Sequence, residues 1–145
     1  MHLALQEAQK AITRGEVPIG CVIVDATTGE VIAAAHNEVE SKPCASAHAE
    51  LLAIERACAT LGDARLPACD LYVTLEPCPM CAQAISFARL RRVYFGAYDP
   101  KGGGVDHGPR IFESSSCLHK PEVMGGIEEE ACSKILVNFF KGLRE

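Results

Sequence analysis

The stretch that decides the fold is Leu71-Tyr72-Val73-Thr74-Leu75-Glu76-Pro77-Cys78-Pro79-Met80-Cys81. Its first five residues form a short, mostly apolar run with β-branched members, which predicts a buried strand. Pro77 ends this strand, and Pro79 suits the first turn of a helix. The stretch therefore predicts a strand that passes directly into a helix, with Cys78 and Cys81 at the junction.

The remaining sequence alternates between helical and strand patterns. Helices are expected at residues 2–14, where Leu5, Ala8 and Ile12 share a face, at 48–61, at about 79–90, and from Glu128 onward; strands are expected at 19–24, 31–35 and 92–96, with a short one within 121–126. The first two strands should form an antiparallel hairpin, and the later strands, joined through helices, should run parallel. These elements predict an α/β fold: a three-layer α/β/α sandwich around a mixed five-stranded sheet, in one domain over residues 1–145.

The charge and composition narrow the function classes. The net charge is -5 and the pI about 5.5, which argues against broad, non-specific binding to nucleic acid or anionic membranes. Residues 89–120 run against this trend, with six basic and three acidic side chains and thus a net charge of +3. No apolar run of about 18 residues and no charged-then-apolar leader is present. We therefore expect no membrane partner and a reducing cytoplasm, where the eight cysteines are free or metal-bound.

Cys78 and Cys81 are candidate metal ligands. Three residues apart in a first helical turn, they lie on one face, and the helix N-terminus favours the thiolate that binds metal. A Cys-x-x-Cys pair also suits a redox function, which this motif alone leaves open. No second such pair exists in the sequence, which disfavours a closed four-cysteine structural site.

His48 and Glu50 form the second motif, at the expected start of a helix. One imidazole and two thiolates make three zinc ligands with an open fourth position, as catalytic sites have. A histidine there is also compatible with packing or capping, and an acid in a first turn commonly compensates the helix dipole. On an ideal helix the two side chains lie about 200° apart, which favours Glu50 as a neighbour of bound water rather than as a fourth ligand.

His-x-Glu followed by Pro-Cys-x-x-Cys resembles the zinc-dependent nucleobase deaminases of the cytidine deaminase-like superfamily. The chain resembles in particular the bacterial tRNA-specific adenosine deaminases, over nearly its whole length. The stretches that carry this resemblance are Gly15–Gly20, Asn37, Ala47–Glu50, Leu71–Cys81 and Phe95–Lys101.

The resemblance implies a role for each matching residue. It places one Zn²⁺ per subunit on His48, Cys78 and Cys81, and it makes Glu50 the proton shuttle. Glu50 would take a proton from water, pass it to the ring nitrogen of adenine and then protonate the departing amine, which yields inosine and ammonia. The substrate-binding positions that it implies are Asn37, Ile19 and Asp99. Taken alone, Asn37 is also compatible with a turn, Ile19 with the core and Asp99 with an Asp-Pro turn.

The resemblance also implies partners and rival functions. It implies a homodimer that acts on the wobble adenosine of a tRNA anticodon stem-loop, with basic residues of the 89–120 stretch as candidates for phosphate contact. The alternatives are a free-base or nucleotide deaminase acting on guanine, cytosine or dCMP, and a non-catalytic zinc-stabilised RNA-binding module. The chain departs from the family at Cys44-Ala45-Ser46, where an acidic residue is usual, and Cys44 is a candidate for a reactive thiol.

Overall fold

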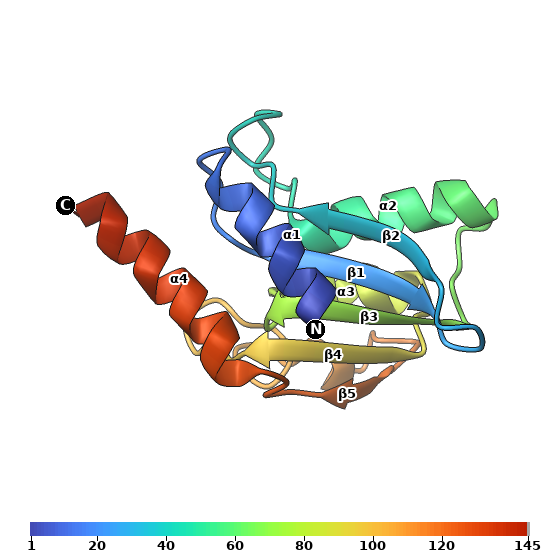
Figure 1. Cartoon of the computed structure of the whole chain (residues 1–145). Coiled ribbons are helices and arrows are strands. Elements are labelled where there is room, and N and C mark those ends of the chain that lie inside the picture. Colours follow the sequence, from blue (N-terminus) through green and yellow to red (C-terminus); the bar gives the residue numbers. More distant parts are fainter. Residues whose placement is uncertain (145) are drawn as a thin grey trace.

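The computed structural model describes residues 1–144, so the last residue of the expected 1–145 domain lies outside it. Its elements follow the order α1 (His2–Ile12), β1 (Gly20–Asp25), β2 (Val31–His36), α2 (Ala49–Leu61), β3 (Cys69–Leu75), α3 (Pro79–Phe87), β4 (Arg92–Ala97), the 3₁₀ turn η1 (Ile111–Glu113), β5 (Glu122–Met124) and α4 (Glu129–Arg144). Figure 1 shows the strands side by side. The expected short strand within 121–126 is therefore present, whereas the 3₁₀ turn was not foreseen.

The five strands form one mixed sheet in the order β2-β1-β3-β4-β5. β1 runs antiparallel to both β2 and β3, while β3, β4 and β5 pair in parallel. β2 and β3 consequently point the same way, and β1 is the one reversed strand. Because α2 follows β2 and α3 follows β3, both helices begin at the same edge of the sheet.

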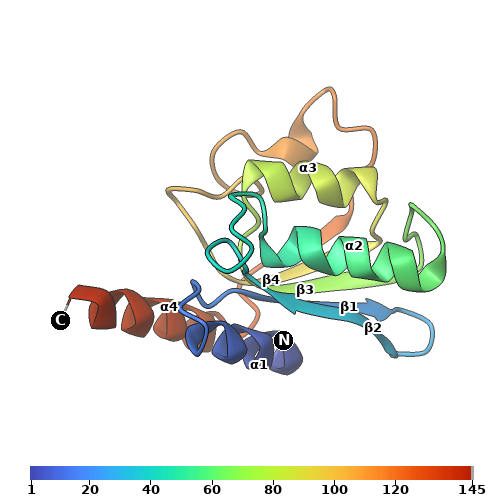
Figure 2. The ribbon, with the colours of Figure 1, turned by 90° about the horizontal axis from the view of Figure 1, so that it is seen from above.

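Helices cover the sheet on both faces, which confirms the three-layer α/β/α prediction. Figure 2 shows α2 and α3 above the sheet and α1 and α4 below it. Alternate strand residues meet α2 and α3 in the main core, which contains Ile23, Leu71, Val73, Val93 and Phe95 from the strands. The core thus fixes both helices that follow the site motifs.

Several helix boundaries differ from the sequence prediction because of local backbone conformation. His48 has extended backbone angles and is the N-cap of α2, so this helix starts one residue later than expected. Arg89 and Glu128 adopt left-handed backbone angles, which exclude them from α3 and α4. Gly62 ends α2 in the left-handed conformation that glycine adopts without strain.

The buried face of α1 also differs from the expectation. The residues in full contact with the sheet are Ala4, Ala8 and Ala11, whereas Ile12 remains 37% exposed. Small side chains allow α1 to lie unusually close to β1, so that a Cβ atom added at Gly20 would stand 1.9 Å from the Ala4 carbonyl oxygen. α1 is therefore held on the sheet by the close packing of small side chains rather than by a stripe of large apolar ones.

The substitution Gly20→Ala is therefore expected to destabilise the protein by roughly 1–3 kcal/mol or more, because α1 must move away from β1. The matched control is Gly142→Ala on α4, where an added Cβ meets nothing within 4 Å. That control should be neutral or stabilising by up to about 1 kcal/mol, since alanine favours the helix. Urea denaturation of both variants measures the difference, and equal stabilities would contradict the close packing of α1.

Candidate active site

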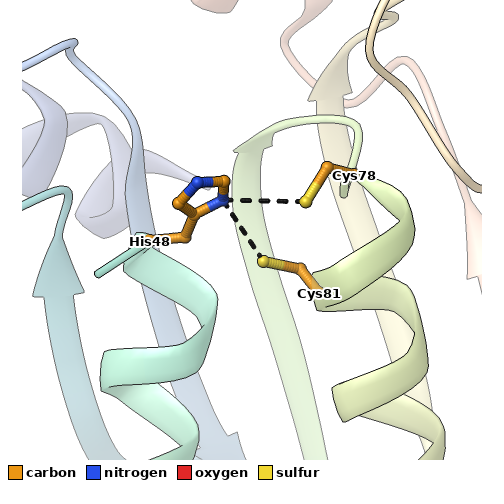
Figure 3. A group of neighbouring side chains, drawn as sticks. All are labelled: His48, Cys78 and Cys81. Atoms are coloured by element: carbon orange, nitrogen blue, oxygen red, sulfur yellow. Dashed lines mark hydrogen bonds between the residues drawn. The ribbon is translucent and has the colours of Figure 1, made fainter. Parts of the chain in front are cut away.

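Two helix N-termini bring three metal-ligating side chains together. His48 is the N-cap of α2, Cys78 is the N-cap of α3, and Cys81 lies in the first turn of α3 after Pro79. Figure 3 shows the three side chains pointing toward one another from these two helices. The His48 Nδ1 atom lies 3.6 Å from the Cys78 Sγ atom and 3.5 Å from the Cys81 Sγ atom. His48 and the two cysteines thus form one cluster, although the cysteines follow His48 by 30 and 33 residues in the sequence.

The geometry and chemistry of this cluster fit a zinc ion. Its three ligand atoms all lie within 4.8 Å of one another. Zinc binds sulfur at about 2.3 Å and imidazole nitrogen at about 2.0 Å, so tetrahedral ligands of these two kinds are about 3.5 Å apart. The observed sulfur–nitrogen distances match this value. Among residues 1–144 no other group of histidine, cysteine or acidic side chains is gathered in this way.

The two cysteines of the cluster differ in proton affinity. A hydrogen bond from Cys81, together with the nearby His48 ring, lowers the pKa of Cys78 to about 4. The same hydrogen bond, burial and the neighbouring Glu50 carboxylate raise the pKa of Cys81 well above its usual range. Contact with the Cys78 sulfur also raises the pKa of His48. One thiolate is therefore available at neutral pH, and the second forms only when a metal displaces its proton.

Glu50 lies directly beside this cluster and is 4% exposed. Burial raises its pKa to about 7, with a further increase from the Cys78 thiolate and an opposing hydrogen bond from Cys81. Because His48 is a cap rather than a helical residue, the ideal-helix angle of about 200° does not describe this pair. A carboxyl group with a pKa near neutrality can both accept and donate a proton.

Asn37 and Ile19 lie next to the start of α2. The Asn37 side-chain carbonyl accepts a hydrogen bond from the Ala49 N–H at 2.9 Å, and the Asn37 N–H donates to the Ile19 carbonyl at 3.1 Å. Asn37 is buried and Ile19 half-buried. The amide oxygen of Asn37 already accepts one hydrogen bond, which leaves its N–H donors and one oxygen lone pair for a ligand.

Asp99 lies in the loop after β4, close to the start of α3. Its N–H donates to the Glu76 carboxylate at 3.0 Å, and its own carboxylate accepts from the Gly102 N–H. The loop continues to Gly104, whose N–H donates to the Pro77 carbonyl beside Cys78. All seven site residues predicted from the sequence therefore lie on segments that meet at one edge of the sheet.

Two buried acids at this edge, Glu16 and Glu76, were not among the predicted site residues. Glu16 accepts hydrogen bonds from the N–H groups of Glu40 and Ser41, which overcome the effect of burial and lower its pKa. Glu76 follows the buried strand β3 and precedes Pro77, and it is 2% exposed. An acid placed between a buried strand and a Pro-Cys motif is the sequence signal that could have found it.

The basic residues of the 89–120 stretch do not form one surface around the cluster. Arg91 pairs with Asp70 and Arg92 with Glu122, at the amino ends of β3 and β4. These ends lie at the opposite edge of the sheet from the start of α3. Lys101 is exposed on the same loop as Asp99. Of the basic residues in this stretch, Lys101 is the one nearest to Asp99 in the sequence, so it remains the candidate for phosphate contact beside the site.

Comparison with known proteins agrees with this site. The cytidine and deoxycytidylate deaminase zinc-binding region matches residues 1–97. A tRNA-specific adenosine deaminase from Agrobacterium fabrum is 52% identical over 99% of this chain and 93% of its own length. The chain belongs to the tRNA-specific adenosine deaminases. Members of this family are zinc-dependent hydrolytic deaminases, so zinc is the cofactor and the predicted enzyme class is confirmed.

Solved structures support the deaminase fold. A structure from work on A-to-I editing by tRNA:A34 deaminases at the wobble position of transfer RNA is 53% identical, has a TM-score of 0.91, and covers 94% of this chain and 97% of its own. A guanine deaminase from Nitrosomonas europaea has a TM-score of 0.83 at 23% identity, over 95% and 81% of the two chains. The tRNA deaminases and guanine deaminases thus share a fold, and the fold alone does not select the base.

Zinc binding to this deaminase is expected to release about one proton or more per ion at pH 7, because the Cys81 thiol must ionise. Zinc affinity should accordingly rise with pH. Titration of the metal-free protein in weak buffer measures the protons released. Cys81→Ser should lose both the metal and the proton release, while Cys58→Ser, outside the cluster, should keep both. Metal binding without proton release would contradict the assignment of Cys81.

Proposed function

We propose that this enzyme deaminates adenosine to inosine at the wobble position of a tRNA anticodon. The observation that carries the proposal is the buried Glu50 carboxyl beside a three-donor metal cluster, in a chain similar over its whole length to tRNA-specific adenosine deaminases. The comparisons support the choice of an RNA substrate, and the geometry of the cluster supports hydrolytic chemistry.

We assign the metal ligands to the His48 Nδ1 atom and the Cys78 and Cys81 sulfurs. These atoms face one another, and three protein ligands are the number that a catalytic zinc site uses. Zinc held by these three residues would supply a water activated for attack at neutral pH. His48 can ligate through Nδ1 only when its proton resides on Nε2.

Glu50 is assigned as the group that moves protons. As a carboxylate it takes a proton from water and passes it to the adenine ring nitrogen while the water oxygen adds to C6. It then takes the proton of the added hydroxyl and delivers it to the amine, so that the C–N bond breaks, ammonia leaves and the oxygen becomes the carbonyl of inosine. Its pKa of about 7 suits both steps, because the acid and base forms are then close in free energy. The positive charge of zinc would lower this pKa, so activity should fall on the acid side at or below pH 7 as Glu50 becomes protonated.

Asn37, Ile19 and Asp99 are assigned to substrate binding. After the hydrogen bond from Ala49, the Asn37 amide keeps its N–H donors and one oxygen lone pair, which suits the mixed donors and acceptors of a purine edge. Ile19 is bonded through its backbone to Asn37 and supplies an apolar side chain beside it. Asp99, on the opposite loop, is suited to contact a nucleotide next to the target. Both sides of the site thus contribute to recognition.

The decisive assay uses a synthetic anticodon stem-loop with adenosine at the wobble position. The zinc-loaded protein should convert this adenosine to inosine, a mass increase of about one dalton that mass spectrometry detects. Glu50→Gln should fold, bind zinc and lose activity by at least about 10²-fold, because the proton shuttle is gone. Glu55→Gln, exposed on the same helix, is the matched control and should remain active.

The rival functions give different results in the same assay. Turnover of free guanine, cytosine or dCMP with no inosine in the stem-loop would favour a small-molecule deaminase. A wild type that binds the stem-loop without converting it, with the same affinity in Glu50→Gln, would favour a non-catalytic zinc-stabilised RNA-binding module. Zinc-free protein as purified would favour the redox interpretation of Cys78 and Cys81.

We also propose a homodimer formed through the outer face of α3. Met80 and Phe87 are one heptad apart on this helix and are 39% and 73% exposed, and the nearby Leu118 is 83% exposed. Apolar side chains grouped on one face are typical of a protein interface. We place the enzyme in the cytoplasm with its tRNA substrate; within residues 1–144 no helix is long and apolar enough to cross a membrane.

Phe87→Glu should convert the dimer to a monomer, because it places a charge in the proposed interface. Analytical ultracentrifugation measures the mass, and unchanged circular dichroism shows that the fold is intact. Leu143→Glu is the matched control, since Leu143 is 69% exposed at the end of α4, away from α3. A monomeric wild type, or a dimer that survives Phe87→Glu, would contradict this interface.

A further inference from the structure

We propose that Glu76 is a positioning residue that holds residues 99–107 as one wall of the substrate site. This inference rests on the proposed function, because it assigns to that loop the binding of the nucleotides around the target base. Glu76 itself is buried and does not face the substrate. It acts through the loop that carries Asp99.

The Glu76 carboxylate binds both ends of this loop. Its Oε1 atom accepts from the Asp99 N–H at 3.0 Å and lies 2.8 Å from the His107 Nδ1 atom. Its Oε2 atom accepts from the N–H groups of Val105, Asp106 and His107 at 3.2, 3.0 and 3.2 Å. The two oxygens of Glu76 thus receive five hydrogen bonds, which join the start of the loop at Asp99 to its end at residues 105–107.

Close packing leaves no room for a side chain at two positions of the loop. A Cβ atom at Gly103 would lie 2.3 Å from the Glu76 Oε2 atom, and one at Gly104 would lie 2.5 Å from the Pro79 nitrogen. The Gly104 N–H also donates to the Pro77 carbonyl at 2.8 Å. The loop therefore rests on the backbone on either side of Cys78 and takes its position from Glu76.

Only a carboxylate satisfies these contacts. Every contact comes from a donor, so both oxygens must accept, and an amide in place of either oxygen would set two donors against each other. Three backbone N–H groups on Oε2 make a buried negative charge tolerable without a basic side chain on that oxygen. Glutamine has almost the same shape as glutamate, so Glu76→Gln tests the charge and hydrogen bonding rather than the volume.

Loss of this carboxylate should affect substrate binding more than metal binding. The cluster residues take their places from α2 and α3, which pack on the sheet in the main core, where Val105 is the member that comes from residues 99–107. Asp99, in contrast, has its N–H bound to Glu76. We therefore expect a change in KM for RNA with zinc stoichiometry unchanged.

The experiment compares Glu76→Gln with wild type on the wobble-adenosine stem-loop. Glu76→Gln should raise KM by about tenfold or more and change kcat much less, because charged hydrogen bonds that position the loop are lost. Glu76→Asp, which keeps the charge on a shorter side chain, should recover part of this loss. Glu113→Gln removes an exposed carboxylate nearby and should leave KM unchanged.

A second readout needs no substrate. Hydrogen exchange at the amides of residues 105–107 should quicken in Glu76→Gln and stay slow in Glu113→Gln. A KM equal to that of wild type, a loss of zinc that accounts for the defect, or unchanged exchange would overturn the proposal. If wild type converts no RNA while the exchange difference is present, the proposed substrate fails and the loop-holding role of Glu76 stands.

Discussion

The whole site depends on two helices that begin at the same edge of the sheet. β2 and β3 point in one direction because the reversed strand β1 separates them, so α2 and α3 start side by side. Their N-terminal residues, His48 and Cys78, therefore face each other across a distance of a few ångströms. Helix N-termini also favour the thiolate form that binds metal. The strand order of the sheet therefore places the backbone positions of the metal cluster next to each other.

Two buried carboxylates at this edge serve opposite purposes because their surroundings differ. At Glu50 the effect of burial outweighs the hydrogen bonds to the carboxylate, and the pKa is raised to about 7. Glu76 is also buried, but its hydrogen bonds from the loop backbone and from His107 overcome the effect of burial and lower its pKa. Glu50 can therefore exchange protons near neutral pH, whereas the Glu76 carboxylate stays ionised and binds the backbone N–H groups of the loop. Neither role follows from the residue type.

The α/β/α layers were predicted because they depend on short-range patterns, whereas the joining of His48 to Cys78 and Cys81 was predicted from the resemblance to zinc-dependent deaminases. The Pro-Cys-Pro-Met-Cys stretch fixes a strand, a turn and a helix start within a few residues, and His-Ala-Glu does the same for α2. The antiparallel pairing of β1 with β3 and the contacts of Glu76 were not predicted, since they join residues far apart in sequence. The hydrogen bond that Asn37 accepts from Ala49 and the placement of Arg91 and Arg92 at the far edge of the sheet also join residues far apart in sequence, so they were not predicted either.

X-ray absorption at the zinc edge tests the central claim most directly. The account predicts two sulfur ligands at about 2.3 Å and two lighter ligands at about 2.0 Å, one from imidazole and one from exchangeable solvent. That pattern would match His48, Cys78 and Cys81 with one position open for chemistry. Four protein ligands, or a third sulfur in the inner sphere, would close that position and contradict a catalytic zinc centre.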